Sequence, residues 1–263
     1  MRIDIYHGEA SEILRSLDSD LVHLTVTSPP YYNARDYASW TSYDGYLKFL
    51  QDIFTQVFRV TVRGRMCAVN ISTYIEAREK RSKESKRYGI PFHFFNIMEG
   101  IGWQFIDDIV WMKPEGAALN RNGGFYQHRK PLAYKPNIVT ESILIFKKPA
   151  DFLIDETIRS YSDDVVKQSL VPGEYERSNV WQINAQTVSD HPAPYPEKLA
   201  SNLVRYYSYA GDTVLDPFLG SGTTALAAYR LYRNSIGIEL HEEYVEMSRE
   251  RIIQQRDLFL GDG

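Results

Sequence analysis

The sequence predicts an α/β fold with a mostly parallel sheet that is covered by helices on both faces. Two observations lead to this prediction. Short apolar runs such as "LVHLTV", residues 21–26, recur along the chain between polar, glycine- or proline-containing stretches, as buried strands do. Segments with apolar residues at helical spacing separate these runs. Strands that alternate with helices favour parallel pairing, because each helix returns the chain to the same edge of the sheet.

The individual elements follow from the same patterns. The predicted strands cover residues 3–8, 21–27, 65–72, 103–112, 141–149, 211–218 and 234–240. The predicted helices cover residues 10–17, 43–61, 91–102, 196–208, 222–232 and 242–255. Gly64 marks a turn before a strand, and Gly102 marks the end of a helix. Residues 150–190 have a weak and polar pattern, so we expect them to be loop-like.

Composition limits the classes of protein. The 263 residues are 43% hydrophobic and 24% charged, as in a soluble globular protein. Cys67 is the single cysteine, so we expect no internal disulfide and no metal site. No apolar run approaches the roughly 20 residues that span a bilayer, and "MRIDIYHGEA" has no signal-peptide core. We therefore expect a cytoplasmic protein without a membrane partner. The net charge of −4 argues against a general nucleic-acid coat but permits a local basic face.

A stiff aromatic corner follows the second predicted strand. The segment "TSPPYY" places Ser28, Pro29, Pro30 and Tyr31 directly after "LVHLTV". Prolines fix the backbone, so the Pro29 carbonyl points in one direction at little entropic cost. A tyrosine beside it offers a flat face on which a ring can stack. The corner is therefore a candidate site for a planar ligand.

A second motif lies near the C-terminus, in "VLDPFLGSGTTALAAYRLYRNSIGIEL". A strand runs into Asp216 and Pro217, then Gly220-Ser221-Gly222, then a helix, and the next strand ends at Glu239. Glycines allow close backbone approach, and an acid at the end of the second strand can accept from both ribose hydroxyls. Neither G-x-G-x-x-G nor G-K-[ST] is present, so the pattern favours a nucleoside over a pyrophosphate or triphosphate.

The two motifs together resemble those of amino-group DNA methyltransferases. "TSPPYY" looks like the catalytic motif (D/N/S)PP(Y/F), and "DPFLGSGTT" with "GIEL" looks like the S-adenosylmethionine motif. "HPAPYPEKLASNLVR", residues 191–205, resembles a further cofactor motif. The catalytic motif comes first, which is the circularly permuted order of the β group. The resemblance implies a Rossmann-like class I methyltransferase fold, with a seven-stranded sheet and an antiparallel hairpin strand at one edge.

The resemblance also implies that three successive parts of the chain have different functions. Residues 1–149 would form the catalytic half, 150–190 a small target-recognition segment, and 191–263 the cofactor half. The implied catalytic residues are Ser28, Pro29, Pro30 and Tyr31. The implied cofactor residues are Glu9, His191, Pro192, Asp216, Pro217, Phe218, Gly220, Ser221, Gly222, Thr223, Thr224 and Glu239. Two positions depart from the pattern: Tyr195 stands where adenine-modifying relatives often carry lysine, and Glu9 where the family tends to have aspartate.

The implied reaction moves a methyl group to the exocyclic amine of a base flipped out of duplex DNA. The amine is a poor nucleophile, so acceptors such as Ser28 Oγ and the Pro29 carbonyl would orient it, while Tyr31 stacks on the base. Serine is the family's commoner choice for the N4 amine of cytosine, and it can donate to cytosine N3. The N6 amine of adenine remains the alternative. A methyltransferase for RNA or a protein amine, and a non-catalytic nucleic-acid-binding module, are further alternatives.

Basic residues near both motifs predict contacts to DNA phosphates. They are Arg35, Arg78, Lys80, Arg81, Lys83, Lys86, Arg87, Arg121, Arg129 and Lys130. Alternatives are a solvated loop for residues 76–91 and an ion pair with Asp36 for Arg35. We expect Tyr32 to Tyr37 to form a loop over the site. Polar side chains within 150–190 would recognise the bases of the target sequence. They are Arg177, Asn179, Gln182, Asn184 and Gln186. The expected partners are double-stranded DNA and a cognate restriction endonuclease, with the protein a monomer or homodimer.

Overall fold

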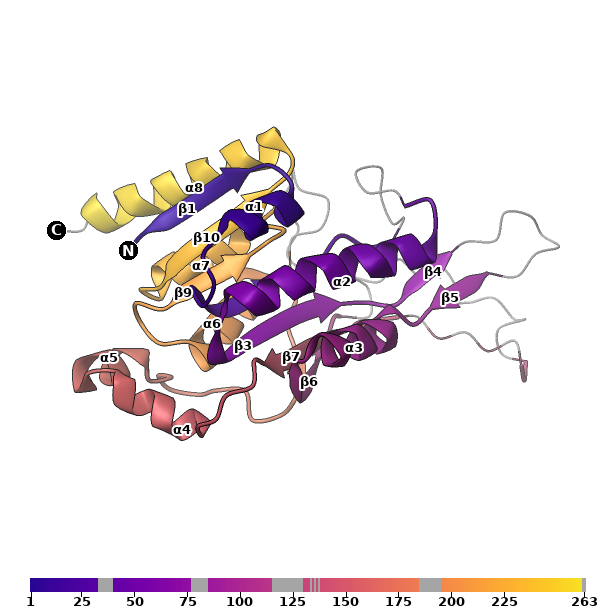
Figure 1. The fold of residues 1–263 in the computed structure, drawn as a ribbon, viewed down its shortest axis with the longest axis horizontal. Helices are drawn as coiled ribbons and strands as arrows, with labels where there is room; N and C mark the ends of the chain where they lie inside the picture. The colour runs from indigo at the N-terminus through magenta and orange to yellow at the C-terminus, as the bar shows by residue number, and fades with distance from the viewer. Residues whose placement is uncertain are drawn as a thin grey trace.

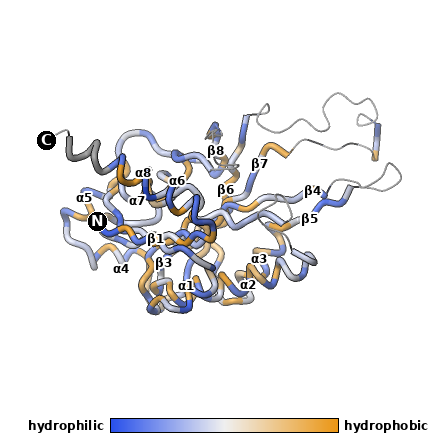
Figure 2. Tube along the Cα trace, turned by 90° about the horizontal axis from the view of Figure 1, so that it is seen from above, coloured by the Kyte–Doolittle hydropathy of each residue, from blue (hydrophilic) through white to orange (hydrophobic). Residues whose placement is uncertain are grey.

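The large sheet contains eight strands in the order β1-β10-β9-β2-β3-β7-β6-β8 (Figure 1). The computed structural model describes residues 1–32, 40–76, 85–114, 130–132, 134, 136, 138–184 and 195–261. The strands are β1 (Ile3–His7), β2 (Val22–Thr27), β3 (Thr61–Ile71), β6 (Gln104–Met112), β7 (Thr140–Lys147), β8 (Val180–Gln182), β9 (Thr213–Asp216) and β10 (Asn234–Glu239). A separate hairpin of β4 (Tyr74–Glu76) and β5 (Lys86–Tyr88) extends beyond the sheet in both views (Figures 1 and 2).

The mostly parallel sheet is confirmed, with two differences in detail. β7 runs antiparallel to both β3 and β6, so the antiparallel strand lies between them and not at the edge. The prediction of seven strands is wrong by one, because β8 adds a parallel strand outside β6. β8 has only three residues, which is too short for a clear alternating pattern. The loop-like expectation for 150–190 is also wrong in part, since this stretch forms α4 (Ile154–Thr157), η3 (Ile158–Ser160) and α5 (Asp163–Ser169) besides β8.

Helices cover both faces of the sheet, as predicted. α1 (Ala10–Ser16), α2 (Tyr43–Val60) and α3 (Ile90–Ile101) lie on one face, and α6 (Glu197–Tyr207), α7 (Thr223–Arg230) and α8 (Glu242–Gly261) lie on the other (Figure 2). Phe54 and Phe94 are fully buried on the first face, and Leu203 and Ala227 are buried on the second. Within the described ranges, no helix has both the length and the apolar character needed to cross a membrane.

The direction of winding reverses between β9 and β2. β9 leads into α7 on one face, whereas β2 leads into α2 on the opposite face. In open α/β sheets, ligands bind in the crevice beyond the carboxyl ends of the strands at such a reversal. Ser28 follows β2 and Asp216 ends β9, so the fold brings the two sequence motifs to neighbouring strand ends.

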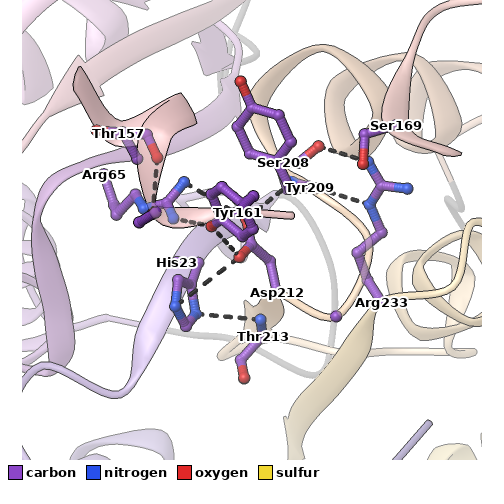
Figure 3. Close-up of polar contacts among 12 residues, drawn as sticks. His23, Arg65, Thr157, Tyr161, Ser169, Ser208, Tyr209, Asp212, Thr213 and Arg233 are labelled. Atoms are coloured by element: carbon purple, nitrogen blue, oxygen red, sulfur yellow. Dashed lines mark hydrogen bonds and ion pairs between the residues drawn. The ribbon is translucent and has the colours of Figure 1, made fainter. Parts of the chain in front are cut away.

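α4, η3 and α5 pack at the amino ends of the parallel strands, where Figure 3 shows the side chains of Tyr161 and Ser169. Asp212, directly before β9, accepts hydrogen bonds from the Tyr161 hydroxyl at 2.5 Å and the Tyr209 backbone N–H at 2.8 Å. Arg65 near the start of β3 contacts Tyr161, and Ser169 Oγ accepts from the Ala210 backbone N–H at 2.8 Å. Residues 151–169 therefore lie at the amino ends of the parallel strands, away from Ser28.

Candidate active site

A cleft of about 560 Å³ lies at the carboxyl ends of the parallel strands. Four strand ends contribute to its walls: Gly8 and Glu9 after β1, residues 28–31 after β2, residues 217–221 after β9, and residues 239–241 at the end of β10. A cleft of this size is large enough for a nucleoside-sized ligand. The topology thus assembles the cleft from segments that are distant in the sequence.

Most predicted site residues line this single cleft. Those that line it are Glu9, Ser28, Pro29, Pro30, Tyr31, Pro217, Phe218, Gly220, Ser221, Thr223 and Glu239. Asp216, Gly222 and Thr224 are not among the lining residues, and they lie behind its wall. His191 and Pro192 lie outside the described residues. The individual roles of all these residues stay predictions.

Asp216 is a buried hydrogen-bond acceptor that joins the two motifs. Its Oδ1 accepts from Thr27 Oγ1 at 2.6 Å and from the Phe218 backbone N–H at 3.1 Å. Its Oδ2 accepts from Thr224 Oγ1 at 2.6 Å and from the Tyr195 hydroxyl at 3.2 Å. Burial raises the pKa of the Asp216 carboxyl, and these four donors act against that rise. Asp216 therefore connects the ends of β2 and β9 beside the cleft.

Tyr195 takes a defined place where related sequences often carry lysine. Its ring lines the cleft, and its hydroxyl contacts both Thr224 and Asp216. Lys198, by contrast, is exposed and pairs with Glu176 at 3.7 Å, away from the cleft. The nearby lysine does not replace the lysine of the related motif.

Glu239 lines the cleft at the end of β10. Its Oε2 accepts from the Gly220 backbone N–H at 2.8 Å, and its Oε1 accepts from the His241 backbone N–H at 2.9 Å. A carboxylate oxygen has two lone pairs, so both oxygens retain capacity for a further donor such as a hydroxyl. The backbone of Gly8 also bonds to the Glu239 carbonyl at 2.9 Å, which fixes the β1 end beside it.

The Gly-Ser-Gly loop needs its last glycine for packing against α8. Gly222 has a φ of +83°, and a Cβ there would approach Ser248 Cβ to 2.8 Å and Ser248 Cα to 3.2 Å. Arg251 of α8 donates to the Ser221 carbonyl at 2.6 Å. We expected Gly220 and Gly222 to let a ligand approach the backbone closely. The structure instead packs Gly222 against Ser248 of α8.

A polar network behind the catalytic corner was not predicted from the sequence. Asn70, near the end of β3, donates through Nδ2 to Glu141 at 2.6 Å and reaches Ser28 Oγ at 3.4 Å. Tyr31 donates its hydroxyl hydrogen to Glu141 at 2.9 Å, and Lys113 pairs with the same carboxylate. The signal was a polar residue close to one end of a buried strand, which is the last part of the strand in "CAVNIS" and the first part in "TESILIF".

Aromatic side chains complete the walls of the cleft. Trp40 and Phe49 line it together with Phe218, with ring centroids 5.6 Å apart for Trp40 and Phe49 and 5.9 Å apart for Phe49 and Phe218. Such rings supply apolar surface and stacking faces for planar ligands. Within the described ranges, no group of three or more His, Cys, Asp or Glu side chains is arranged to hold a metal ion.

Tyr32 lies inside a tyrosine cluster and not in a loop over the site. It is 8% exposed and contacts Tyr43, Tyr74 and Tyr88 edge-on, with centroids 5.2, 5.6 and 5.4 Å away. The cluster ties the catalytic corner to α2 and to the β4–β5 hairpin. The other residues of that expected loop, 33–37, lie outside the described residues.

Of the predicted DNA contacts, Lys86, Arg87 and Lys130 are described, and all three are exposed. Lys86 and Arg87 belong to β5. The predicted contacts Arg35, Arg78, Lys80, Arg81, Lys83, Arg121 and Arg129 lie outside the described residues. Among the expected base readers, Asn179 donates to the Asp108 carbonyl at 3.0 Å, while Gln182 and Asn184 are exposed beside β8.

The doubly wound sheet and the cleft at its winding reversal, with Ser28-Pro29-Pro30-Tyr31 in its wall, define a protein of the amino-group methyltransferase class. A family model described as DNA methylase matches residues 22–250. The chain belongs to this family of DNA amino-methyltransferases.

Curated relatives carry the names of type II methyltransferases. The chain is 30% identical to the type II beta methyltransferase M.BslI of Bacillus sp. (strain NEB-606), with 96% of this chain aligned. It spans only 28% of the length of that relative. It is 28% identical to the type II methyltransferase M.SmaI of Serratia marcescens, with 95% of this chain and 90% of the relative covered.

Solved structures share the architecture. TTHA0409 of Thermus thermophilus, complexed with S-adenosyl-L-methionine, superposes with a TM-score of 0.78 at 28% identity, covering 95% of this chain and 93% of that one. The PvuII DNA methyltransferase, named as cytosine-N4-specific, superposes with a TM-score of 0.69 at 19% identity, covering 95% and 86%. The second likeness concerns the fold alone, and both agree with the Rossmann-like methyltransferase fold.

Proposed function

We propose that the protein transfers a methyl group from S-adenosylmethionine to the N4 amine of a cytosine flipped out of duplex DNA. The observation that carries this proposal is the single cleft that holds both Ser28 and Glu239. An acid suited to ribose hydroxyls and an acceptor suited to an amine share one enclosed space there. The complex of TTHA0409 with S-adenosyl-L-methionine supports the choice of cofactor.

The cofactor would occupy the side of the cleft formed by β9 and β10. Glu239 would accept from the ribose hydroxyls, with its carboxylate oriented by the backbone N–H groups of Gly220 and His241. Thr223 begins α7, so free N–H groups and the positive end of the helix would face the methionine carboxylate. Phe218 would supply an apolar wall. The methyl group would then point toward the β2 end.

The base would enter beside the Ser-Pro-Pro corner. Its exocyclic nitrogen is a weak nucleophile because the lone pair is shared with the ring. Ser28 Oγ and the Pro29 carbonyl would accept from its N–H bonds and turn the lone pair toward the methyl group. The nitrogen then forms a bond to the methyl carbon as the carbon–sulfur bond breaks, and the sulfur keeps the electron pair. Stacking on Tyr31 would recover roughly 1–3 kcal/mol of the cost of unstacking the base.

Ser28 is the reason for preferring cytosine over adenine. A serine hydroxyl can accept from the amine and can also donate to the neighbouring ring nitrogen, whereas an ionised aspartate only accepts. The N6 amine of adenine is the second candidate, because the matching family includes both activities in its name. Enzymatic digestion of methylated DNA followed by mass spectrometry of the nucleosides decides between N4-methylcytosine and N6-methyladenine.

The proposed roles are tested by two substitutions with opposite effects. Ser28→Ala should abolish transfer of labelled methyl groups to duplex DNA while S-adenosylmethionine still binds. Glu239→Gln should weaken cofactor binding about tenfold, which corresponds to about 1.4 kcal/mol. Equal loss of binding in both variants would contradict the assignment. Parallel reactions with RNA and with protein separate the alternative substrates, and no transfer to any DNA would overturn the proposal.

The remaining assignments extend the same proposal. The β4–β5 hairpin and Lys130 would contact DNA phosphates. Within the expected target-recognition segment 150–190, Gln182 and Asn184 at the carboxyl end of β8 are better placed than residues 151–169, which pack at the other edge. The type II names of the relatives support a partner restriction endonuclease. A cytoplasmic location and a monomeric or homodimeric state stay predictions.

A further inference from the structure

A buried carboxylate lies behind the catalytic corner without lining the cleft. Glu141 is the second residue of β7 and is 8% exposed. It accepts from the Tyr31 hydroxyl at 2.9 Å and from Asn70 Nδ2 at 2.6 Å, and it pairs with Lys113. Removing such a charge pair from water costs about as much as the pairing returns, so stability alone is a weak reason for it.

Hydrogen bonds connect both Ser28 and Tyr31 to Glu141, the first through Asn70 and the second directly. Asn70 must present Nδ2 to the carboxylate, because its oxygen there would face another acceptor. The same Nδ2 points toward Ser28 Oγ, so the serine oxygen accepts on that side. Burial and the Glu141 charge raise the pKa of the Tyr31 phenol well above its ordinary value, whereas a hydrogen bond with Ser28 lowers it. Ser28 and Tyr31 are therefore hydrogen-bonding neighbours, and a serine hydroxyl is able to donate to a phenol oxygen.

The chemistry of amine methylation needs such an acceptor. When the nitrogen takes the methyl group, it becomes cationic and still carries its hydrogens. Because the nitrogen is attached to an electron-poor ring, this cation is a strong acid, and a carboxylate is a sufficient base. One proton must therefore leave the nitrogen as the new bond forms, and Ser28, which lines the cleft, is the acceptor proposed above for that N–H bond.

We propose that Glu141 takes up this proton through Ser28 and Tyr31. The Ser28 hydroxyl, which donates to the ring nitrogen while the base is bound, turns to the Tyr31 oxygen as the methyl group is transferred. The amine passes a proton to Ser28 Oγ, Ser28 passes its own to the Tyr31 oxygen, and Tyr31 passes its own to Glu141 Oε2. Both hydroxyls end neutral, the methylated amine ends neutral, and the carboxylate becomes a carboxylic acid. Lys113 keeps its positive charge throughout. The inference rests on the proposed methyl transfer, and it makes Glu141 a positioning residue that acts through Tyr31 without touching the substrate.

The test compares single-turnover methyl transfer from labelled S-adenosylmethionine to unmethylated duplex DNA in the full-length chain. Glu141→Gln and Tyr31→Phe should each slow the transfer by about 10²-fold. Tyr31→Phe keeps the stacking ring and removes only the hydroxyl. The double variant should be no slower than either single variant, because the proton path is interrupted once in each case. Glu99→Gln, an exposed glutamate of α3, is the matched control and should keep the wild-type rate.

Three further measurements separate a proton role from a structural one. The transfer rate of Glu141→Gln should rise with pH, because hydroxide replaces the lost acceptor, whereas the wild-type rate should not. The Kd for S-adenosylmethionine should change by no more than about twofold, since Glu141 does not line the cofactor side. Thermal unfolding shows whether each variant is folded, and Tyr31→Phe keeps the test valid if Glu141→Gln is not.

Two results would overturn this inference and leave the proposed function intact. One is a folded Glu141→Gln protein that transfers methyl groups at the wild-type rate. The other is a double variant whose loss equals the product of the two single losses, with a pH profile parallel to the wild type. A wild-type protein that methylates no DNA would instead overturn the proposed function, and this inference with it.

Discussion

Thr27 Oγ1 donates a hydrogen bond of 2.6 Å to Asp216 Oδ1, across 189 positions of sequence. Both residues are 1% exposed. Thr27 is the last residue of β2, directly before the catalytic corner, and Asp216 is the last residue of β9, shortly before the Gly-Ser-Gly loop. This hydrogen bond therefore adds a side-chain connection at the strand ends to the parallel pairing of β2 with β9.

Replacing Thr27 by valine should separate the two strand ends. Valine keeps the shape but leaves Asp216 Oδ1 with one donor fewer, so the free energy of unfolding should fall by about 1–3 kcal/mol. Urea denaturation measures the change. Thr25→Val on the same strand is the control, because the Thr25 hydroxyl contacts the thiol of Cys67 and no carboxylate, and its loss should cost less. Equal losses at both positions would contradict the special role of the Asp216 contact.

Gly222→Ala should destabilise the protein by more than 1 kcal/mol, on the order of 1–3 kcal/mol. The φ of +83° strains any L side chain, and the added Cβ would meet backbone and side-chain atoms of Ser248. Gly100→Ala in α3 is the contrasting change, since a Cβ there meets nothing within 4 Å. It should stabilise the helix by about 0.4–1 kcal/mol. Thermal unfolding of both variants checks the pair, and a stable Gly222→Ala protein would refute the packing argument.

The sequence identified the cleft because its residues follow strand ends in short motifs. Ser28 and Glu239 both come directly after or at the end of an apolar run, and parallel strands align such ends at one edge. Asp216 also lies at a strand end, but its side chain turns inward to four donors. Sequence position predicts which edge a residue occupies, whereas side-chain direction depends on neighbours from distant segments.

The structural features that the sequence did not predict depend on tertiary contacts. Asn70 and Glu141 meet only because β7 inserts antiparallel beside β3, where Asn70 pairs with Ile143 in the ladder. β8 forms because three residues pair in parallel with the edge of β6 that β7 leaves free. Gly222 looks like a ligand-contact glycine in the chain, yet its constraint comes from Ser248 of α8. None of these partners is adjacent in the sequence, so no local sequence pattern predicts the contacts.

His23 should make the protein less stable as the pH falls. Burial lowers the pKa of His23 below 6.5 in the folded state, with Asp212 acting against the shift and Arg65 with it. The Thr213 backbone N–H also donates to Nδ1 at 3.2 Å, so a proton there would displace that bond. The unfolded chain thus binds more protons below pH 6.5, and the free energy of unfolding decreases as the pH drops through that range.

His23→Gln should remove this part of the pH dependence. Thermal unfolding at pH values on either side of the ordinary histidine pKa of about 6.5 measures it. The difference in Tm between the two conditions should be smaller in His23→Gln than in the wild type. His93→Gln, at an exposed histidine of α3, should keep the wild-type difference. A pH dependence that is unchanged in His23→Gln would assign the effect to other groups.

The β4–β5 hairpin should contribute to the salt dependence of DNA binding. Lys86 and Arg87 lie on β5, and Tyr88 beside them packs on Tyr32 of the catalytic corner at 5.4 Å. The two cations therefore lie on a strand that packs against the residue directly after Tyr31, on the side where the flipped base is proposed to enter. Each phosphate contact that is lost reduces the slope of log K against log [salt] by about 0.9 for duplex DNA. The double variant Lys86→Gln/Arg87→Gln should bind duplex DNA with a slope shallower by about 1 to 2.

The control variant also removes two positive charges, but at the amino ends of the parallel strands. Arg159 in η3 and Lys167 in α5 are exposed near the amino ends of the strands, and their double glutamine variant should leave the slope unchanged. Fluorescence anisotropy with one labelled duplex at several salt concentrations measures both variants. If the two pairs reduced the slope equally, the effect would reflect net charge and not a DNA path over the hairpin. A shallower slope for the hairpin pair alone would place the phosphates along β5, at the same carboxyl edge of the sheet as Ser28.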